Sequence, residues 1–129
     1  MGTRDKIPGS SMVVAVLVPC LDEETTVAGV VTGFQGELSE ATVYVYDNTS
    51  VDATAKRAAE AGAVVRFESI PGKGSVVRRM FADVDADVYV MADGDGTYDP
   101  ADAPLLVKRL VEDNLDMVVG CRVGSTGRL

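Results

Sequence analysis

Two aspartates separated by a single residue, Asp93 and Asp95, are the side chains in this sequence that most directly suggest chemistry. They follow the apolar run 88–92 and alternate with glycines in Asp93-Gly-Asp-Gly96. Because the run is short and rich in β-formers, it predicts a buried strand that ends at the two carboxylates. Carboxylate oxygens placed in this way can share one hard cation such as Mg²⁺ or Mn²⁺, which would neutralise a diphosphate. The same four residues are also typical of a simple turn.

The rest of the chain alternates between strand-like and helix-like patterns. Apolar runs predict strands at about 12–18, 42–46, 63–67, 87–92 and 116–120. Apolar residues at three- and four-residue spacing predict helices after Thr25, at about 52–61, from Ser75 and from Pro100 to about residue 114. The third helix is expected to place Phe81 on its apolar face, and the fourth to bury Leu106 and Leu110. This alternation predicts an α/β fold, a three-layer Rossmann-like and mostly parallel sheet with helices on both faces.

Clusters of polar residues and glycines follow the first four predicted strands, at 19–23, 47–50, 72–74 and 93–95. In a parallel sheet these loops share one edge, which is where open α/β folds bind ligands. Asp47 can accept hydrogen bonds from a base or a ribose, whereas Asn48 and Ser50 are expected to build a turn and cap the next helix. Glu23 can hold a nucleoside or simply favour a helix N-terminus.

Lys73 lies between two glycines directly before a predicted helix. Such a loop offers backbone N–H groups and one cation to a phosphate, although a solvated lysine in a turn is the alternative. The spacing does not match a P-loop. Arg78 and Arg79, in the following helix, are expected to be surface residues. The sequence therefore places one candidate phosphate ligand near the edge that carries the paired aspartates.

Composition excludes several classes of function. The chain has 129 residues, one domain's worth, with a net charge of −8 that argues against nucleic-acid binding. It contains no histidine, which excludes Ser-His-Asp and Cys-His chemistry. The sequence has no run of 18 apolar residues, so no transmembrane helix is predicted. Residues 1–11 are expected to be a flexible leader or residues left over from an expression tag. The two cysteines, Cys20 and Cys121, are expected to be reduced in a cytoplasmic protein.

Four segments in order resemble the nucleotide-binding half of a family 2 glycosyltransferase with the GT-A fold, and most closely the polyprenyl-phosphate sugar transferases. They are residues 18–24, 47–54, 72–74 and 93–100. The resemblance implies that Pro19, Leu21 and Glu23 line a nucleoside pocket, that Asp47 contacts the base and that Lys73 lies near the nucleotide. It also implies that Asp93 and Asp95 form the Asp-x-Asp pair, with Asp95 the more direct ligand of Mg²⁺ or Mn²⁺.

The resemblance further implies a nucleotide-diphospho-sugar donor, a UDP- or GDP-sugar, and an acceptor that includes a lipid phosphate among the candidates. Two departures, Asp22 in place of the commoner Asn and Asn48 in place of a second Asp, bear on donor preference. The expected domain spans 12–122, with a tail at 123–129 and no acceptor-binding half, so no catalytic base can be assigned. A location in the cytoplasm, with contact to a membrane surface, and self-association through exposed apolar surface are also expected.

Two alternatives compete with this interpretation. Asp93-Gly-Asp-Gly-Thr97 also resembles the nucleophile motif of haloacid-dehalogenase-type phosphatases, in which Asp93 would attack phosphate and Asp95 would act as acid and base. That fold, however, usually carries the motif on its first strand. The second alternative is a module that binds a nucleotide sugar without transferring it.

Overall fold

The computed structural model describes residues 12–115, which form an α/β unit built on a parallel sheet. Its strands are β1 (Val14–Cys20), β2 (Thr42–Asp47), β3 (Val64–Phe67) and β4 (Val88–Met91), in the spatial order β3-β2-β1-β4. Every pairing is parallel. The predicted parallel sheet is therefore confirmed, with strand ends shifted by one or two residues. The strand predicted at 116–120 lies outside the described residues.

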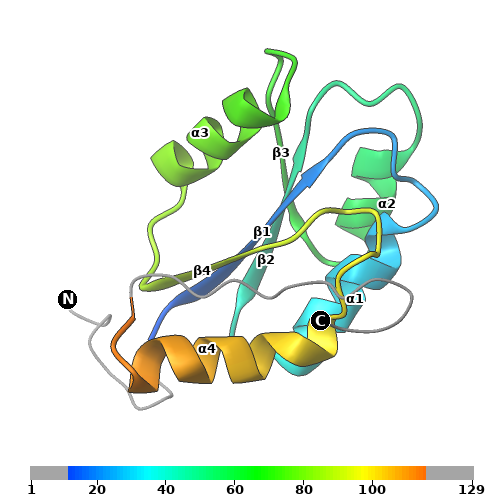
Figure 1. Ribbon diagram of the computed structural model, residues 1–129. Coiled ribbons are helices and arrows are strands. Elements are labelled where there is room, and N and C mark those ends of the chain that lie inside the picture. The colour runs from blue at the N-terminus through cyan, green and yellow to red at the C-terminus, as the bar shows by residue number, and fades with distance from the viewer. Residues whose placement is uncertain (1–11, 116–129) are drawn as a thin grey trace.

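Helices cover both faces of this sheet (Figure 1). Helices α1 (Val27–Glu37), α2 (Thr54–Glu60) and α4 (Ala103–Glu112) lie on one face, and α3 (Lys73–Asp83) lies on the other. A short 3₁₀ helix, η1 (Pro100–Asp102), leads into α4, and the side chain of Asp99 accepts a hydrogen bond from the backbone N–H of Ala101 at 3.0 Å. The three predicted layers are thus present.

Strand β1 supplies residues to the cores on both faces. Val16 and Val18 pack with α1 and α2, while Ala15 and Leu17 pack with α3, and all four are buried. A strand with helices on both faces needs apolar residues in both registers. This requirement explains the continuous apolar run in the sequence and fixes the carboxyl end of β1 at the centre of the sheet edge.

Three local expectations were wrong. Helix α3 begins at Lys73 and not at Ser75, because Gly72 takes a positive φ of 109° and turns the chain into the helix. Phe81 is 46% exposed, with its ring edge-on to Tyr89 at 5.0 Å between centroids. Leu106 and Leu110 are only half-buried, whereas Ala103 is the residue of α4 that is fully buried.

The start of α4 is held against α1 by a close contact at Gly33. A Cβ atom added there would lie 2.8 Å from Pro100 Cγ, so the absence of a side chain lets η1 approach the helix. What matters for the site is that η1 fixes the end of the segment that carries Asp93 and Asp95.

Candidate functional site

A cavity of about 290 Å³ opens at the carboxyl ends of β1, β2 and β4 and at the start of α3. Polar residues and glycines from all four predicted clusters line it. Its wall consists of Pro19, Cys20, Leu21, Glu23, Asn48, Gly72, Lys73, Val76, Asp93 and Asp95. The convergence expected for the edge of a parallel sheet is therefore present in the folded chain.

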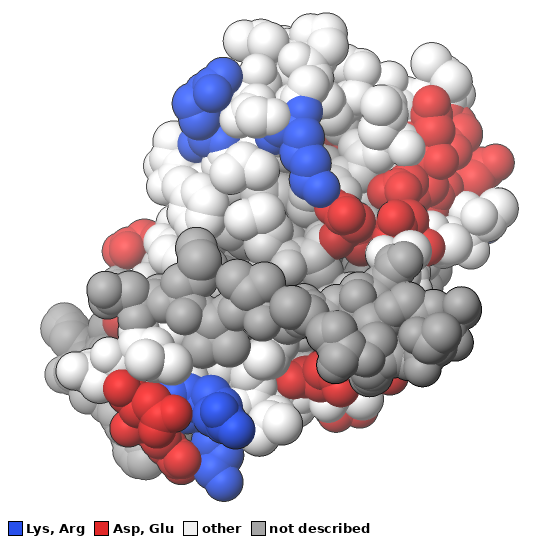
Figure 2. Space-filling view, in the orientation of Figure 1, with Lys and Arg blue, Asp and Glu red and all other residues white. Residues whose placement is uncertain are grey.

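One side of the cavity carries the paired aspartates and the lysine. The ammonium of Lys73 forms an ion pair with the carboxylate of Asp93. Asp95 Oδ1 accepts hydrogen bonds from the backbone N–H of Thr97 at 3.0 Å and from its hydroxyl at 2.7 Å. In Figure 2 basic side chains gather over α3 and acidic side chains lie beside them on the same face. This side is open, because about half of each side chain of the ion pair is exposed.

Glu23 faces the same aspartates from the loop after β1. Burial, followed by the charges of Asp95 and Asp93, raises the pKa of Glu23 above its usual value, and the charge of Lys73 lowers it less. Three carboxylates therefore share one electrostatic environment with one lysine. Such an arrangement favours a ligand or ion that brings further positive charge.

The floor between the two sides is a tight contact between Cys20 and Gly94. A Cβ atom added at Gly94 would lie 2.3 Å from Cys20 Sγ and 2.9 Å from Glu23 Oε1. The hydroxyl of Thr26, at the start of α1, donates to the carbonyl of Gly94 at 2.6 Å. Cys20 is a free and buried thiol, and burial together with the charges of Glu23, Asp47 and Asp93 raises its pKa to about 12. The thiol therefore stays protonated near neutral pH, and it packs against the backbone of Gly94.

The loops after β1 and β2 are tied together by reciprocal hydrogen bonds. Asp22 has a positive φ of 54°, its backbone N–H donates to Ser50 Oγ at 2.8 Å, and its carboxylate accepts from the N–H of Val51 at 2.8 Å. The N–H of Glu23 donates to the hydroxyl of buried Thr54 at 2.8 Å.

A second reciprocal pair continues this bracing two residues farther along each loop. The N–H of Glu24 donates to Asp52 at 3.3 Å, and the carboxylate of Glu24 accepts from the N–H of Ala53 at 3.0 Å. A hydrogen bond from the Thr54 hydroxyl is the largest cause that lowers the pKa of Asp52. This part of the site is shaped before any ligand binds.

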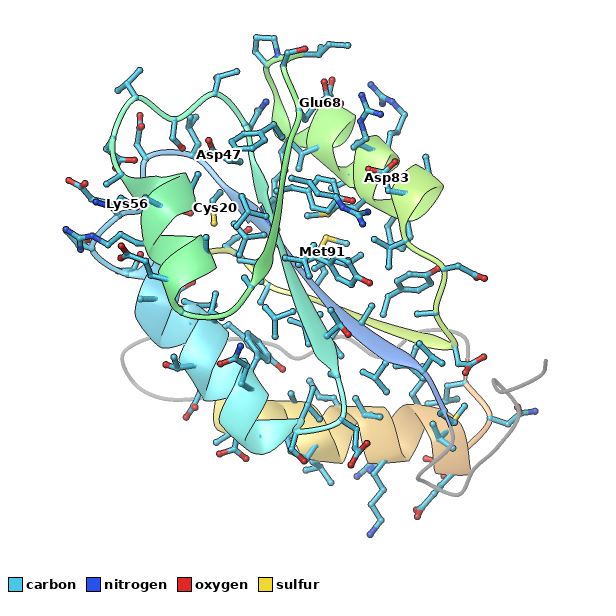
Figure 3. The ribbon with its side chains drawn as sticks, turned by 180° about the vertical axis from the view of Figure 1, so that it is seen from behind. Cys20, Asp47, Lys56, Glu68, Asp83 and Met91 are labelled. Carbon is cyan, nitrogen blue, oxygen red and sulfur yellow. The ribbon has the colours of Figure 1, made fainter. Side chains whose placement is uncertain are left out.

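Asp47 occupies a different position from the other candidates. It is buried, its carboxylate accepts a hydrogen bond from the hydroxyl of Ser50, and it does not line the cavity. Figure 3 shows Cys20, Asp47 and Glu68 at the same end of the sheet. The other predicted side chains, Pro19, Leu21, Glu23, Lys73, Asp93 and Asp95, all line the cavity. A role for Asp47 at the base of a nucleotide stays a prediction.

Sequence reasoning missed three contributors to the site. Asn48 lines the cavity and makes hydrogen bonds to Glu68, Ile70 and Gly72 that hold the loop before α3. Glu68 is buried and pairs with Arg79, a residue that was expected to be only a surface cation. The signal available in the sequence was a glutamate at the end of a strand followed by an arginine at helical distance, which is too common to be specific.

The donor set suits a hard cation. Within residues 12–115, no group of three or more His, Cys, Asp and Glu side chains forms a complete metal cage. Two neighbouring carboxylates are nevertheless what Mg²⁺ uses when substrate phosphates and water complete its shell. Asp93 and Asp95 therefore fit an ion that binds together with a diphosphate.

Comparison with known proteins identifies the family. The chain matches the glycosyl transferase family 2 over residues 15–128, and it therefore belongs to that family. It is 50% identical over 109 residues to Protein RfbJ of Shigella flexneri, and the aligned region covers 84% of each chain. It is 39% identical over 110 residues to the glycosyltransferase AglJ of Haloferax volcanii, over 84% of this chain and 36% of AglJ. The domain is thus a family 2 glycosyltransferase domain, as the motif order predicted.

Solved structures support the same fold. Glucosyl-3-phosphoglycerate synthase of Mycobacterium tuberculosis superposes with a TM-score of 0.70 at 28% identity, over 79% of this chain and 41% of that chain. That enzyme has been crystallised with UDP, with Mg²⁺ and UDP, and with Mn²⁺, UDP-glucose and phosphoglyceric acid. The present chain spans most of RfbJ but less than half of AglJ and of the synthase.

The family and the topology together disfavour a haloacid-dehalogenase-type phosphatase. The Asp-x-Asp-Gly-Thr motif follows β4 and not the first of the described strands.

Among the helices that the structure describes, none has the length and apolar character needed to cross a bilayer.

Proposed function

We propose that this domain binds a nucleotide-diphospho-sugar, a UDP- or GDP-sugar, together with Mg²⁺ or Mn²⁺, and presents it for transfer to an acceptor. The observation that carries the proposal is a single cavity lined by Lys73, Asp93 and Asp95 and also by Pro19 and Leu21. Charged and apolar lining residues in one cavity match a ligand that has both a diphosphate and a nucleoside.

In this proposal Asp95, assisted by Asp93, holds the metal. The bound ion would neutralise the diphosphate and stabilise it as the leaving group. A metal is needed on electrostatic grounds, because two like charges about 4 Å apart repel by roughly 4 kcal/mol at an effective dielectric of 20. One lysine, Lys73, does not offset a diphosphate that faces two carboxylates.

Pro19, Leu21 and Glu23 form the nucleoside side of the proposed complex, and Asp47 lies behind them as the proposed contact to the base. We expect Asp47→Ala to weaken nucleoside diphosphate binding by about 1–3 kcal/mol, the cost of leaving a buried polar group without its partner. Unchanged affinity by calorimetry would remove Asp47 from the site.

The proposed acceptor is a lipid phosphate of the polyprenyl type. Its attacking oxygen is already ionised, so it requires no general base. This property suits a chain that contains no histidine. Such an acceptor would bring the protein to the cytoplasmic surface of a membrane, and assays with and without a polyprenyl phosphate test it directly.

A module that binds a nucleotide sugar without transferring it is the second candidate. The observation behind it is that the cavity of the described residues accounts for binding of a nucleotide and a metal ion, whereas transfer also needs a site for the acceptor. Transfer of a radiolabelled sugar from its nucleotide to any acceptor by the isolated chain would exclude it. Nucleotide binding without transfer would support it.

The proposed function is tested by titrating UDP and GDP into the protein in EDTA, in Mg²⁺ and in Mn²⁺. We expect binding of one nucleotide to require the ion, and Asp95→Asn to abolish that requirement together with most of the affinity. Equal affinity in all three conditions and in both proteins would contradict the metal site and leave residues 93–96 as a turn.

A further inference from the structure

The loop at residues 68–72, which delivers Lys73 to the cavity, is held by buried polar side chains and not by apolar packing. Ile70 in this loop is 60% exposed, so its side chain does not anchor the segment. Two of the four buried polar or charged residues of the described chain, Asn48 and Glu68, instead make their hydrogen bonds to the loop. We call Asn48, Glu68 and Arg79 the clasp.

Asn48 binds the loop with both ends of its amide. Its Nδ2 group donates to the carbonyl of Glu68 at 2.8 Å and to the carbonyl of Ile70 at 3.0 Å, while its Oδ1 accepts from the N–H of Gly72 at 3.0 Å. Both amide protons are used, so Asn48 has no donor left for a ligand although it lines the cavity. Its position at the cavity therefore serves the loop.

Glu68 closes the clasp from the other direction. Its Oε2 accepts from the N–H of Ile70 at 2.7 Å, and its Oε1 accepts from the Nε of Arg79 in α3 at 3.1 Å. The hydrogen bond from Ile70 is the largest cause that lowers the pKa of Glu68, and Arg79 contributes further. The loop is thus joined to β2 through Asn48 and to α3 through Glu68.

These contacts set where the first residue of α3 lies. Gly72 is fixed by Asn48 and adopts the positive φ from which α3 starts, and Lys73 follows it at once. The ammonium of Lys73 then reaches Asp93 in the loop after β4. Because the Lys73 side chain is long and 59% exposed, the placement of its backbone decides whether its ammonium can reach Asp93 at the cavity.

We propose that Asn48 and Glu68 are positioning residues for phosphate recognition: they hold the 68–72 loop so that Lys73 faces the diphosphate of the bound nucleotide. This inference rests on the proposed function. It also assigns a reason to the asparagine at 48. A carboxylate there could not donate to two carbonyl groups and would bring negative charge to the backbone it must hold.

The first experiment compares a nucleoside with its diphosphate. Asn48→Asp and Glu68→Gln should each weaken UDP or GDP binding in Mn²⁺ by roughly tenfold, the usual order for a disturbed buried hydrogen bond. The affinity for uridine or guanosine should stay unchanged, because neither side chain donates to the nucleoside. Asn114→Asp and Glu60→Gln make the same chemical changes at exposed positions and serve as matched controls.

The second experiment asks whether the clasp acts through Lys73. Lys73→Ala should weaken diphosphate binding, and adding Glu68→Gln to it should cause little further loss. Such non-additivity is expected when one residue works through another. Glu68→Gln keeps the shape of the side chain, so it remains informative even if Asn48→Asp fails to fold, which thermal unfolding of each variant reveals.

The outcomes separate this inference from the proposed function. If the wild-type protein binds neither UDP nor GDP with Mn²⁺, the proposed function fails. If it binds but the folded clasp variants bind equally well, the clasp does not position Lys73. Additive losses in the double variant, or equal losses for nucleoside and diphosphate, would also overturn the inference, because they indicate a general structural role.

Discussion

The two sides of the cavity differ in how far the chain alone completes them. On the side proposed for the nucleoside, the loops after β1 and β2 exchange hydrogen bonds at Asp22, Glu23 and Glu24, so their backbone is fixed. On the side proposed for the diphosphate, Asp93 and Asp95 stand at an open edge, and Asp93 has Lys73 as its cation. Both sides rest on the same floor, the contact between Cys20 and Gly94.

This difference indicates a division of labour. A preformed nucleoside side lowers the cost of ordering the protein when the ligand binds. Asp93 and Asp95 place like charges together on the other side, which makes binding there depend on the positive charge that a metal ion brings.

The largest expected effect concerns the reactivity of Cys20. Its pKa is raised from 9.0 to about 12, so its thiolate fraction near neutral pH falls by roughly a thousandfold. We expect iodoacetamide at pH 8 to leave Cys20 unmodified in the native protein and to modify it in urea, as measured by peptide mass spectrometry in a Cys121→Ser background. Because the folded pKa exceeds the unfolded one, the contribution of Cys20 to stability should be constant below about pH 9 and fall as the pH rises above it. Rapid native labelling would show that the floor is loose.

The second prediction is that Gly94→Ala disrupts the floor. The new Cβ atom would meet Cys20 Sγ at 2.3 Å, so we expect a loss of about 3 kcal/mol in the free energy of unfolding, at the upper end of overpacking. Cys20→Ala should relieve the clash with the sulfur atom, because the Cβ atom of Cys20 is 3.6 Å away, and the remaining contact at 2.9 Å is with Oε1 at the end of the Glu23 side chain. Gly29→Ala, which meets no atom within 4 Å, is the control in urea unfolding. Additive losses in the double variant would refute the direct contact.

The sequence predicted the fold well because the relevant signals are local. The apolar run of β1 indicates a strand that is buried on both faces, and the glycines that follow β4 indicate a turn. Gly72 could have shown where α3 starts, but glycine alone does not reveal a positive φ. The contacts of Asn48 with Gly72 and of Glu68 with Arg79 join residues that no periodicity connects. The burial of Asp47 likewise depends on which way the end of β2 turns, and only the assembled sheet decides that.

The third prediction tests the rigidity of the nucleoside side. Thr54→Val keeps the shape of a buried side chain but removes the hydroxyl that accepts from the N–H of Glu23 and donates to Asp52. We expect a loss of about 1–3 kcal/mol in stability, because buried polar groups lose their partner. Amide exchange at residues 22–24 should accelerate. The same change at Thr32, whose exposed hydroxyl bonds within α1, should have little effect, and equal effects at both sites would contradict a braced loop.

The smallest effect is expected on the open side, and its sign is what matters. In the nucleotide-free protein the ammonium of Lys73 is paired with the carboxylate of Asp93. Lys73→Met frees this carboxylate, so Mn²⁺ without nucleotide should bind more tightly to the variant. Exposed ion pairs contribute about 0.2–1 kcal/mol, which limits the gain to about fivefold. The same variant should bind UDP or GDP less tightly in saturating Mn²⁺, because the diphosphate loses its cation.

Electron paramagnetic resonance of free Mn²⁺ measures the first affinity, and calorimetry measures the second. Removing any positive charge from a protein of net charge −8 attracts cations, so Lys56→Met, an exposed change on α2, corrects for that general effect. If Lys73 were only a surface lysine, Lys73→Met and Lys56→Met would change the affinities for Mn²⁺ and for the nucleotide in the same way. Opposite signs for Lys73→Met alone would show that one ammonium group first neutralises Asp93 and then yields it to the metal when the diphosphate arrives.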